Sequence, residues 1–329
     1  MTGGNISSEK IDLLVYGPNK PIIDKGFSDQ FVLHPVETRA DLERVNPAVA
    51  AKVRGLAVTY STARCDSAVM AMFPKLEIAA SFGVGYDHVD AKYASEHNII
   101  VTNTPDVLTE EVADIAMGLL IATLREFIKA DRYLRSGLWT TQQYPLSVGS
   151  LRDRKVGIVG MGRIGQAIAR RLEASLVPVV YHTRNPVAGL KYKHYPDLIE
   201  MAKAVDTLVV IVPGSPSTAK MINAEVFKAL GPRGVIVNVA RGSVVDEEAM
   251  IAALKSGAIL AAGLDVFANE PAVPDELRAM QNVVLLPHIG SASVVTRNAM
   301  DQLVVDNLKS WFAGKGPLTP IAETPVKSR

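Results

Sequence analysis

Four polar side chains, Arg241, Asp265, Glu270 and His288, each follow an apolar run in the second half of the chain. These runs predict buried strands, and open α/β sheets bind ligands beyond the carboxyl ends of their strands. A guanidinium can hold a carboxylate and polarise a carbonyl, and an imidazole can deliver a proton near neutral pH. Together these residue types suit the reduction of a 2-keto acid.

Each of the four residues has a role in that chemistry. Arg241 would anchor the substrate carboxylate and His288 would donate the proton. Glu270 would keep the imidazole protonated, which leaves Asp265 to orient the carboxamide of a nicotinamide ring. Taken singly, each residue also has a structural explanation, such as a surface arginine or a turn aspartate. The combination at successive strand ends favours the catalytic interpretation.

The hydride donor is indicated by the stretch "VGIVGMGRIGQAIARRL" at 156–172. An apolar strand precedes Gly160, which permits a tight turn. Gly162 lets backbone approach a pyrophosphate, and Gly165 lets the following helix pack close to the sheet. The N–H groups at the start of that helix can bind phosphates. We therefore predict a dinucleotide site, with a purely structural turn as the alternative.

The residues after the next strand indicate which dinucleotide binds. An NAD site usually has Asp or Glu about 20 residues beyond the glycines, but "VPVVYHTRNP" has none. Arg184 can pair with a 2′-phosphate and the Thr183 hydroxyl can donate to it. This predicts a preference for NADP(H), with NAD(H) use possible. The alternative is that Arg184 is a solvated turn residue.

The elements that position these groups alternate between strand and helix patterns, which predicts an α/β fold with parallel sheets. A continuous helix is predicted over 109–137, a second long helix over 291–315, and a frayed Pro-rich end over 317–329. Strands are predicted at 11–17, 55–60, 76–85, 98–105, 155–160, 177–182, 207–212, 234–238, 260–264 and 283–286.

The composition of the chain disfavours several classes of function. The chain has 329 residues with 35 Lys and Arg against 34 Asp and Glu, so no net field favours nucleic acid or a membrane surface. The single cysteine, Cys65, allows neither an intrachain disulfide nor a Cys-based zinc site, and no metal is predicted. We expect it to be a partly buried structural residue rather than a catalytic thiol. The N-terminus lacks a secretion signal, so a cytoplasmic location is expected.

The glycine stretch, "NVARGSVVDEEAMIAAL", "AGLDVFANEP" and "LLPHIGSAS" resemble the D-isomer-specific 2-hydroxyacid dehydrogenases, in particular the glyoxylate/hydroxypyruvate reductase branch. "ASFGVGYDHVD" and "VTNTPDVLTEEVADIAMGLL" extend the resemblance to most of the chain. It implies two doubly wound parallel-sheet domains. A Rossmann cofactor domain at 104–289 would be inserted into a flavodoxin-like substrate domain at 1–103 plus 290–329.

The resemblance also implies site residues. Arg241, Glu270 and His288 take the catalytic roles, and the backbone N–H groups of Val84 and Gly85 would hold the substrate carboxylate, unless that loop is a simple β-turn. Trp139 would line a substrate pocket across a homodimer, with an ordinary buried tryptophan as the alternative. The implied cofactor contacts are Gly160, Met161, Gly162, Arg163, Ile164, Gly165, Thr183, Arg184, Val212, Pro213, Thr218, Val239, Ala240, Asp265 and Gly290.

We therefore predict an NADPH-dependent reductase that converts a small 2-keto acid, of the glyoxylate or hydroxypyruvate type, to the D-2-hydroxy acid. The alternative is a dinucleotide-sensing regulatory protein of the same fold, similar to a corepressor. A dehydrogenase for a large phosphorylated acid is disfavoured, because "GVGYDHVD" offers no Lys or Arg. Expected partners are the small acid and a second copy of the chain, but neither nucleic acid nor membrane.

Overall fold

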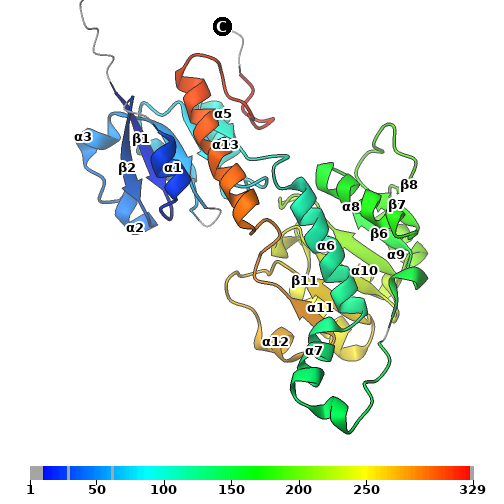
Figure 1. Ribbon diagram of the computed structural model, residues 1–329. Coiled ribbons are helices and arrows are strands. Elements are labelled where there is room, and N and C mark those ends of the chain that lie inside the picture. Colours follow the sequence, from blue (N-terminus) through cyan, green and yellow to red (C-terminus); the bar gives the residue numbers. More distant parts are fainter. Residues whose placement is uncertain (1–9, 28–29, 61–62, 148, 327–329) are drawn as a thin grey trace, which may run out of the picture. The chain divides into compact units, whose positions relative to one another are not determined.

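The structure is a computed structural model that describes residues 10–27, 30–60, 63–147 and 149–326 (Figure 1). The N-terminal residues 1–9, where a secretion signal would begin, lie outside the described part. The chain forms two compact units, Met1–Leu108 with Ser293–Arg329 and Thr109–Ala292. It thus passes between units at 108/109 and 292/293, where the sequence predicts 103/104 and 289/290.

Unit 1 contains a parallel five-stranded sheet in the order β2-β1-β3-β4-β5, the doubly wound order typical of flavodoxin-like folds. Four of its strands are predicted from the sequence. The edge strand β2 is not, because His34 and Pro35 interrupt its apolar pattern, and proline in a sheet is largely confined to edges. The strands are β1 (Ile11–Tyr16), β2 (Phe31–Val36), β3 (Val53–Val58), β4 (Ile78–Ser81) and β5 (Ile100–Thr102).

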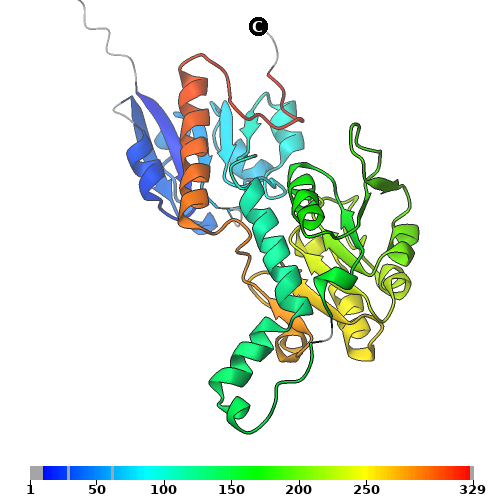
Figure 2. The ribbon, with the colours of Figure 1, turned by 45° about the vertical axis from the view of Figure 1, so that its right-hand side comes forward.

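Helices cover this sheet, and the last long helix packs on β3, β4 and α1 (Figure 2). Cys65 is fully buried, and burial raises the pKa of its thiol to about 12. Cys65 is therefore more completely buried than the sequence predicts, which suits a structural residue. The helices of unit 1 are α1 (Pro21–Gly26), α2 (Arg39–Leu42), α3 (Pro47–Ala50), α4 (Ser67–Ala71), α5 (Ala91–Glu96) and α13 (Val294–Phe312).

The C-terminal segment after α13 is ordered in the described residues, so the predicted fraying is wrong as far as residue 326. Ile321 and Thr324 are 4% and 3% exposed. The Ile321 N–H donates to the Val101 carbonyl at 3.0 Å, and the Thr324 hydroxyl accepts from the Val101 N–H at 3.0 Å. These two inward-facing side chains hold the Pro-rich segment on β5, which proline content alone does not reveal.

Unit 2 contains a parallel seven-stranded sheet in the order β12-β11-β10-β9-β6-β7-β8. The order reverses at β6, the strand that leads into the glycine-rich turn, which makes this a Rossmann-type sheet and confirms the predicted fold class. The short edge strand β8 is missed because its residues are polar. The strands are β6 (Val156–Val159), β7 (Val179–His182), β8 (Lys193–Tyr195), β9 (Thr207–Val210), β10 (Val235–Asn238), β11 (Ala261–Leu264) and β12 (Val283–Leu285).

The predicted helix over 109–137 is two helices, α6 (Thr109–Leu124) and α7 (Phe127–Arg135). Glu126 separates them with a φ of 51°, in the left-handed region that helices exclude. In the described part of the chain, no helix is both long enough and apolar enough to span a membrane. The other helices of unit 2 are η1 (Leu138–Thr140), η2 (Leu151–Asp153), α8 (Arg163–Ala174), α9 (Leu198–Ala204), α10 (Ala224–Leu230), η3 (Gly242–Val244), α11 (Glu247–Ser256) and α12 (Asp275–Ala279).

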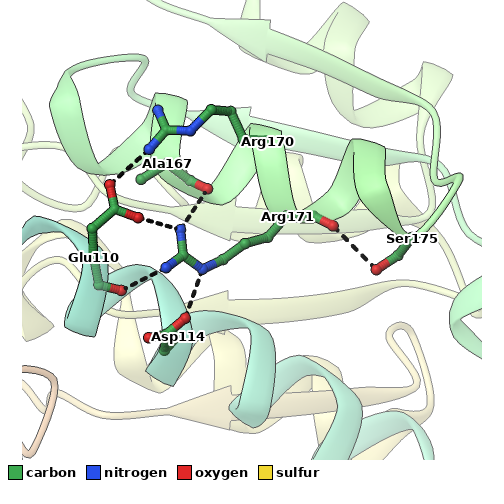
Figure 3. Close-up of polar contacts among 6 residues, drawn as sticks. All are labelled: Glu110, Asp114, Ala167, Arg170, Arg171 and Ser175. Atoms are coloured by element: carbon green, nitrogen blue, oxygen red, sulfur yellow. Dashed lines mark hydrogen bonds and ion pairs between the residues drawn. The ribbon is translucent and has the colours of Figure 1, made fainter.

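Helix α8, which begins at the glycine-rich turn, is fastened to α6 by ion pairs (Figure 3). Arg171 lies 2.7 Å from both Asp114 Oδ1 and Glu110 Oε2, and Arg170 lies 2.7 Å from Glu110 Oε1. Arg171 also donates to the Glu110 carbonyl at 3.1 Å. A surface network of this kind adds little stability per pair, but it fixes the position of α8 along α6.

Candidate active site

Each of the three glycines has the surroundings that its place in a dinucleotide turn requires. Gly160 has a φ of 103°, and a Cβ there would lie 2.6 Å from the Ile211 carbonyl oxygen. A Cβ on Gly165 would lie 2.1 Å from the Gly160 carbonyl oxygen, whereas one on Gly162 would meet nothing within 4 Å. Gly160 therefore makes the turn, Gly165 allows close helix packing, and Gly162 leaves space for a ligand.

The start of α8 is suited to an anion. Gly162 caps the helix without a side-chain hydrogen bond, so the first N–H groups are not satisfied by a capping residue. These groups and the helix dipole favour a phosphate at this end. Met161 is buried at the turn, while Arg163 is exposed and Ile164 is half-buried. The residues present thus fit the pyrophosphate of a dinucleotide.

The end of β7 holds the residues predicted to select NADP(H). Arg184 is exposed, and the Thr183 hydroxyl donates to the Asn185 carbonyl at 2.6 Å. The Thr183 carbonyl lies 2.9 Å from Nε2 of His194. No carboxylate stands in this turn. The Thr183 hydroxyl would have to leave Asn185 in order to donate to a ligand, so Arg184 is the stronger candidate for contact with a 2′-phosphate.

The loops after β9 and β10 hold the remaining predicted cofactor contacts. Val212 is half-buried and Pro213 is exposed in the first loop. The Thr218 hydroxyl donates to the Pro213 carbonyl at 2.7 Å and closes this loop. Val239 and Ala240 are 7% and 4% exposed in the second loop.

Asn238 fixes the backbone conformation of the second loop, and the sequence pattern did not predict this role. Its side chain is buried, accepts from the Ala240 N–H at 3.0 Å and donates to the Arg241 carbonyl at 3.1 Å. It therefore fixes the backbone from which the Arg241 side chain extends. A buried amide at a strand end is the signal that would have found it.

His288 and Glu270 form a direct pair. Nδ1 of His288 lies 2.7 Å from Oε2 of Glu270, and Oε1 of Glu270 accepts from the Phe267 N–H at 3.0 Å. Burial raises the pKa of Glu270, but the His288 contact and the Phe267 N–H lower it by more, so the pKa lies below its ordinary value. The carboxylate stays ionised at neutral pH and accepts from Nδ1, which leaves Nε2 for proton exchange.

Arg241 stands beside this pair. Its charge helps to lower the pKa of Glu270, and its Nη1 donates to the Ala240 carbonyl at 2.9 Å. A Cβ on Gly242 would lie 1.9 Å from the Phe267 carbonyl carbon. Only glycine therefore allows the end of β10 to approach the segment after β11 that carries Glu270. The structure thus brings together the three side chains predicted to be catalytic.

Asp265 holds the turn that carries His288. It is 2% exposed, and its two carboxylate oxygens accept from the N–H groups of Ile289 at 2.7 Å and Gly290 at 2.8 Å. The His288 N–H donates to the Asp265 carbonyl at 2.9 Å. His288 has a φ of 54°, a strained conformation that these bonds maintain. This anchoring role was missed in the sequence, and a contact of Asp265 to a nicotinamide carboxamide stays a prediction.

The predicted substrate loop lies in unit 1. Gly83 has a φ of 117°, and Val84 and Gly85 are half-buried. Within the described residues, no backbone carbonyl accepts from the N–H groups of Val84 and Gly85. Trp139 of unit 2 is 65% exposed, so the alternative of an ordinary buried tryptophan is wrong. Among the residues that the structure describes, no cluster of His, Cys, Asp and Glu is arranged to hold a metal ion.

Comparison with known proteins identifies the family. Residues 117–290 match the model of the D-isomer specific 2-hydroxyacid dehydrogenase NAD binding domain. A glyoxylate/hydroxypyruvate reductase A of Arabidopsis thaliana is 47% identical over 264 residues, which cover 80% of this chain and 84% of the relative. A hydroxyphenylpyruvate reductase of Plectranthus scutellarioides is 42% identical, over 95% of this chain and 99% of the relative.

A solved structure is similar over nearly the whole chain. The NADPH-dependent glyoxylate/hydroxypyruvate reductase of Sinorhizobium meliloti, in complex with NADP and malonate, is 53% identical with a TM-score of 0.91. The match covers 98% of this chain and 99% of that one. With the Rossmann sheet and the Arg241, Glu270 and His288 cluster, these findings show that the chain belongs to the D-isomer specific 2-hydroxyacid dehydrogenase family of NAD(P)-dependent oxidoreductases.

Proposed function

We propose that this chain reduces a small 2-keto acid, of the glyoxylate or hydroxypyruvate type, with NADPH. The product is the D-2-hydroxy acid, or achiral glycolate in the case of glyoxylate. The observation that carries the proposal is the 2.7 Å contact of His288 with Glu270, with the Arg241 charge beside it. Relatives named as glyoxylate and hydroxypyruvate reductases support the substrate class.

In this proposal His288 is the proton donor. Glu270 accepts from Nδ1 and fixes the orientation of the ring, so Nε2 can give its proton to the carbonyl oxygen. Arg241 holds the substrate carboxylate and polarises the carbonyl. When bound, NADPH supplies the hydride that the carbonyl carbon receives. Asp265 acts at a distance from the reacting atoms, because it holds the backbone of His288.

The preference for NADPH rests on the end of β7. Exposed Arg184 can form charge-assisted hydrogen bonds to a 2′-phosphate. The turn has no carboxylate to accept from the 2′-hydroxyl of NAD(H) or to repel the phosphate. The similar S. meliloti enzyme is described as NADPH-dependent. We expect NADH to be used less efficiently rather than excluded.

We also propose a homodimer formed through α7 and η1. This segment exposes Phe127, Leu134, Leu138 and Trp139 at 52%, 55%, 43% and 65%. Apolar side chains gathered in this way mark an interaction surface. Light scattering coupled to size exclusion should give twice the chain mass. Leu134→Glu should shift the protein towards monomer, and a monomeric wild type would contradict the dimer.

Steady-state oxidation of NADPH and NADH, each with glyoxylate, hydroxypyruvate, pyruvate and a bulky aromatic keto acid, tests the reaction. We expect the highest kcat/KM for NADPH with glyoxylate or hydroxypyruvate, and D-glycerate as the product of the latter. Tight NADPH binding without turnover of any keto acid would contradict the enzyme and favour a dinucleotide sensor.

A further inference from the structure

The loop at Gly83–Tyr86 is held by residues far away in the sequence. The Gly83 N–H donates to the Thr104 hydroxyl at 2.9 Å, and the Thr104 N–H donates to the Gly83 carbonyl at 2.9 Å. The Asn103 side-chain amide donates to the Val84 carbonyl at 2.8 Å. Two successive carbonyls of the loop are therefore bound to the residues that follow β5.

These bonds determine where the loop N–H groups point. The Gly83 carbonyl shares a planar peptide unit with the Val84 N–H, and the Val84 carbonyl shares one with the Gly85 N–H. Both units are trans, so each N–H points away from its bound carbonyl. With the carbonyls fixed on Thr104 and Asn103, both N–H groups are turned away from these residues, as a pair that can bind one carboxylate.

Asn103 is in turn held by the C-terminal segment. Its N–H donates to the Thr319 carbonyl at 3.2 Å, and its carbonyl accepts from the Thr319 hydroxyl at 2.6 Å. The same hydroxyl accepts from the Asn307 side chain at 2.9 Å. Asn307 is fully buried on α13, and its Oδ1 accepts from the N–H groups of Leu318 and Thr319 at 2.9 and 3.0 Å. The Asn307 bonds thus fix Thr319 relative to α13, and the two Thr319 bonds fix Asn103 relative to Thr319.

A second contact joins the C-terminal segment to the loop directly. The Tyr86 hydroxyl donates to the Glu323 carboxylate, 3.0 Å from Oε2. Glu323 lies between Ile321 and Thr324, the buried side chains that anchor the segment to β5. The loop is therefore linked to the C-terminal segment at two points, through Asn103 at Val84 and through Glu323 at Tyr86.

We propose that the C-terminal segment contributes to substrate binding through Thr319, and that Asn103, Asn307 and Thr319 are positioning residues for the carboxylate-binding N–H pair of Val84 and Gly85. The inference rests on the proposed function and extends it to residues that contact no substrate. If Thr319 loses its hydroxyl, Asn103 is less firmly held, the Val84–Gly85 peptide can rotate, and the pair loses its shared orientation.

Two variants and a matched control test this. Asn103→Ala and Thr319→Val should each raise the KM for glyoxylate about tenfold, which corresponds to roughly 1.4 kcal/mol of binding. The kcat and the Kd for NADPH should stay within about twofold, because unit 2 is unchanged. Thr319→Ser, which keeps the hydroxyl, should restore the wild-type KM. Thr324→Val removes a buried hydroxyl from the same segment without touching Asn103, so it should lower the Tm but leave KM unchanged.

The outcomes separate this inference from the proposed reaction. A wild-type KM in Asn103→Ala, or an equal rise of KM in Thr324→Val, would overturn the positioning role while wild-type turnover still supports the reductase. If the wild type turns over no keto acid, the proposed function fails. Calorimetry with oxalate and NADPH then decides the inference. Weaker oxalate binding by Asn103→Ala than by wild type supports it, whereas equal binding, or none to either, overturns it.

Discussion

The two units of the molecule offer different kinds of chemical group to a ligand. In unit 2 the groups proposed to act on the substrate are the side chains of Arg241, Glu270 and His288, which lie in the segments that follow β10, β11 and β12. In unit 1 the loop at Val84 and Gly85 offers backbone N–H groups, whose direction depends on Asn103 and Thr319. The residue type at a position therefore determines which side-chain group unit 2 offers. The direction of the backbone N–H groups in unit 1 depends instead on residues elsewhere in the chain.

The largest effect should come from removing the Arg241 side chain, which is proposed to hold the substrate carboxylate. Arg241→Ala should lower kcat/KM for glyoxylate by roughly a hundred- to a thousandfold, because a charged donor to the carbonyl and carboxylate is lost. NADPH binding, measured by fluorescence titration, should change little. Arg241→Lys keeps the charge without the planar fork and should recover only part of the activity. A loss below tenfold in Arg241→Ala would contradict the role.

A smaller effect should follow from weakening the hydrogen bonds by which Asp265 holds the turn that carries His288. Asp265→Asn leaves one oxygen to accept from two N–H groups, of Ile289 and Gly290. One buried donor then lacks its partner, which should cost about 1–3 kcal/mol of unfolding free energy. Urea unfolding would measure this, and kcat should fall about tenfold as the His288 turn relaxes. An unchanged unfolding midpoint would mean that Asp265 does not secure this turn.

A substitution at Arg184, in the turn after β7, should affect the KM for NADPH more than the KM for NADH. Arg184→Ala should raise the KM for NADPH about tenfold, since a charge-assisted contact to the 2′-phosphate is removed. The KM for NADH should stay within about twofold. Both constants come from initial rates at saturating glyoxylate. An equal change for the two nucleotides would show that Arg184 does not distinguish them.

The smallest effect concerns acid stability. The pKa of Glu270 is lower in the folded chain than its ordinary 4.5. The contribution of Glu270 is therefore complete above the unfolded pKa and is lost as the pH falls through the lower folded pKa. The difference in unfolding free energy between wild type and Glu270→Gln should shrink as urea titrations move from pH 7 to below about 4.5. A difference that grows on acidification would reverse the assigned sign.

Most of the fold is predictable because its strands are buried on both faces and read as apolar runs. The elements missed or misplaced are those where tertiary contacts override local pattern. β2 contains His34 and Pro35, which interrupt its apolar pattern. The long helix breaks at Glu126, where the backbone is left-handed although no glycine or proline in the sequence indicates a break. The C-terminal segment looks frayed by composition, yet Ile321 packs against the sheet.

The site divides in the same way. Arg241, Glu270 and His288 could be predicted because reactive residue types stand at strand ends. The supporting roles could not, although Asp265 itself was among the predicted residues. Asp265 and Asn307 accept hydrogen bonds from backbone N–H groups that only the folded chain brings near them. A residue whose function is to hold backbone has no distinctive spacing in the sequence.

The central claim is that His288, paired with Glu270, delivers the proton in the reduction of a 2-keto acid. Single-turnover oxidation of NADPH by saturating glyoxylate, followed by stopped-flow in wild type and His288→Ala, tests it most directly. We predict a rate at least about a hundredfold slower in the variant, as expected for loss of a general acid, with the Kd for NADPH nearly unchanged. Equal rates in the two proteins would contradict the account.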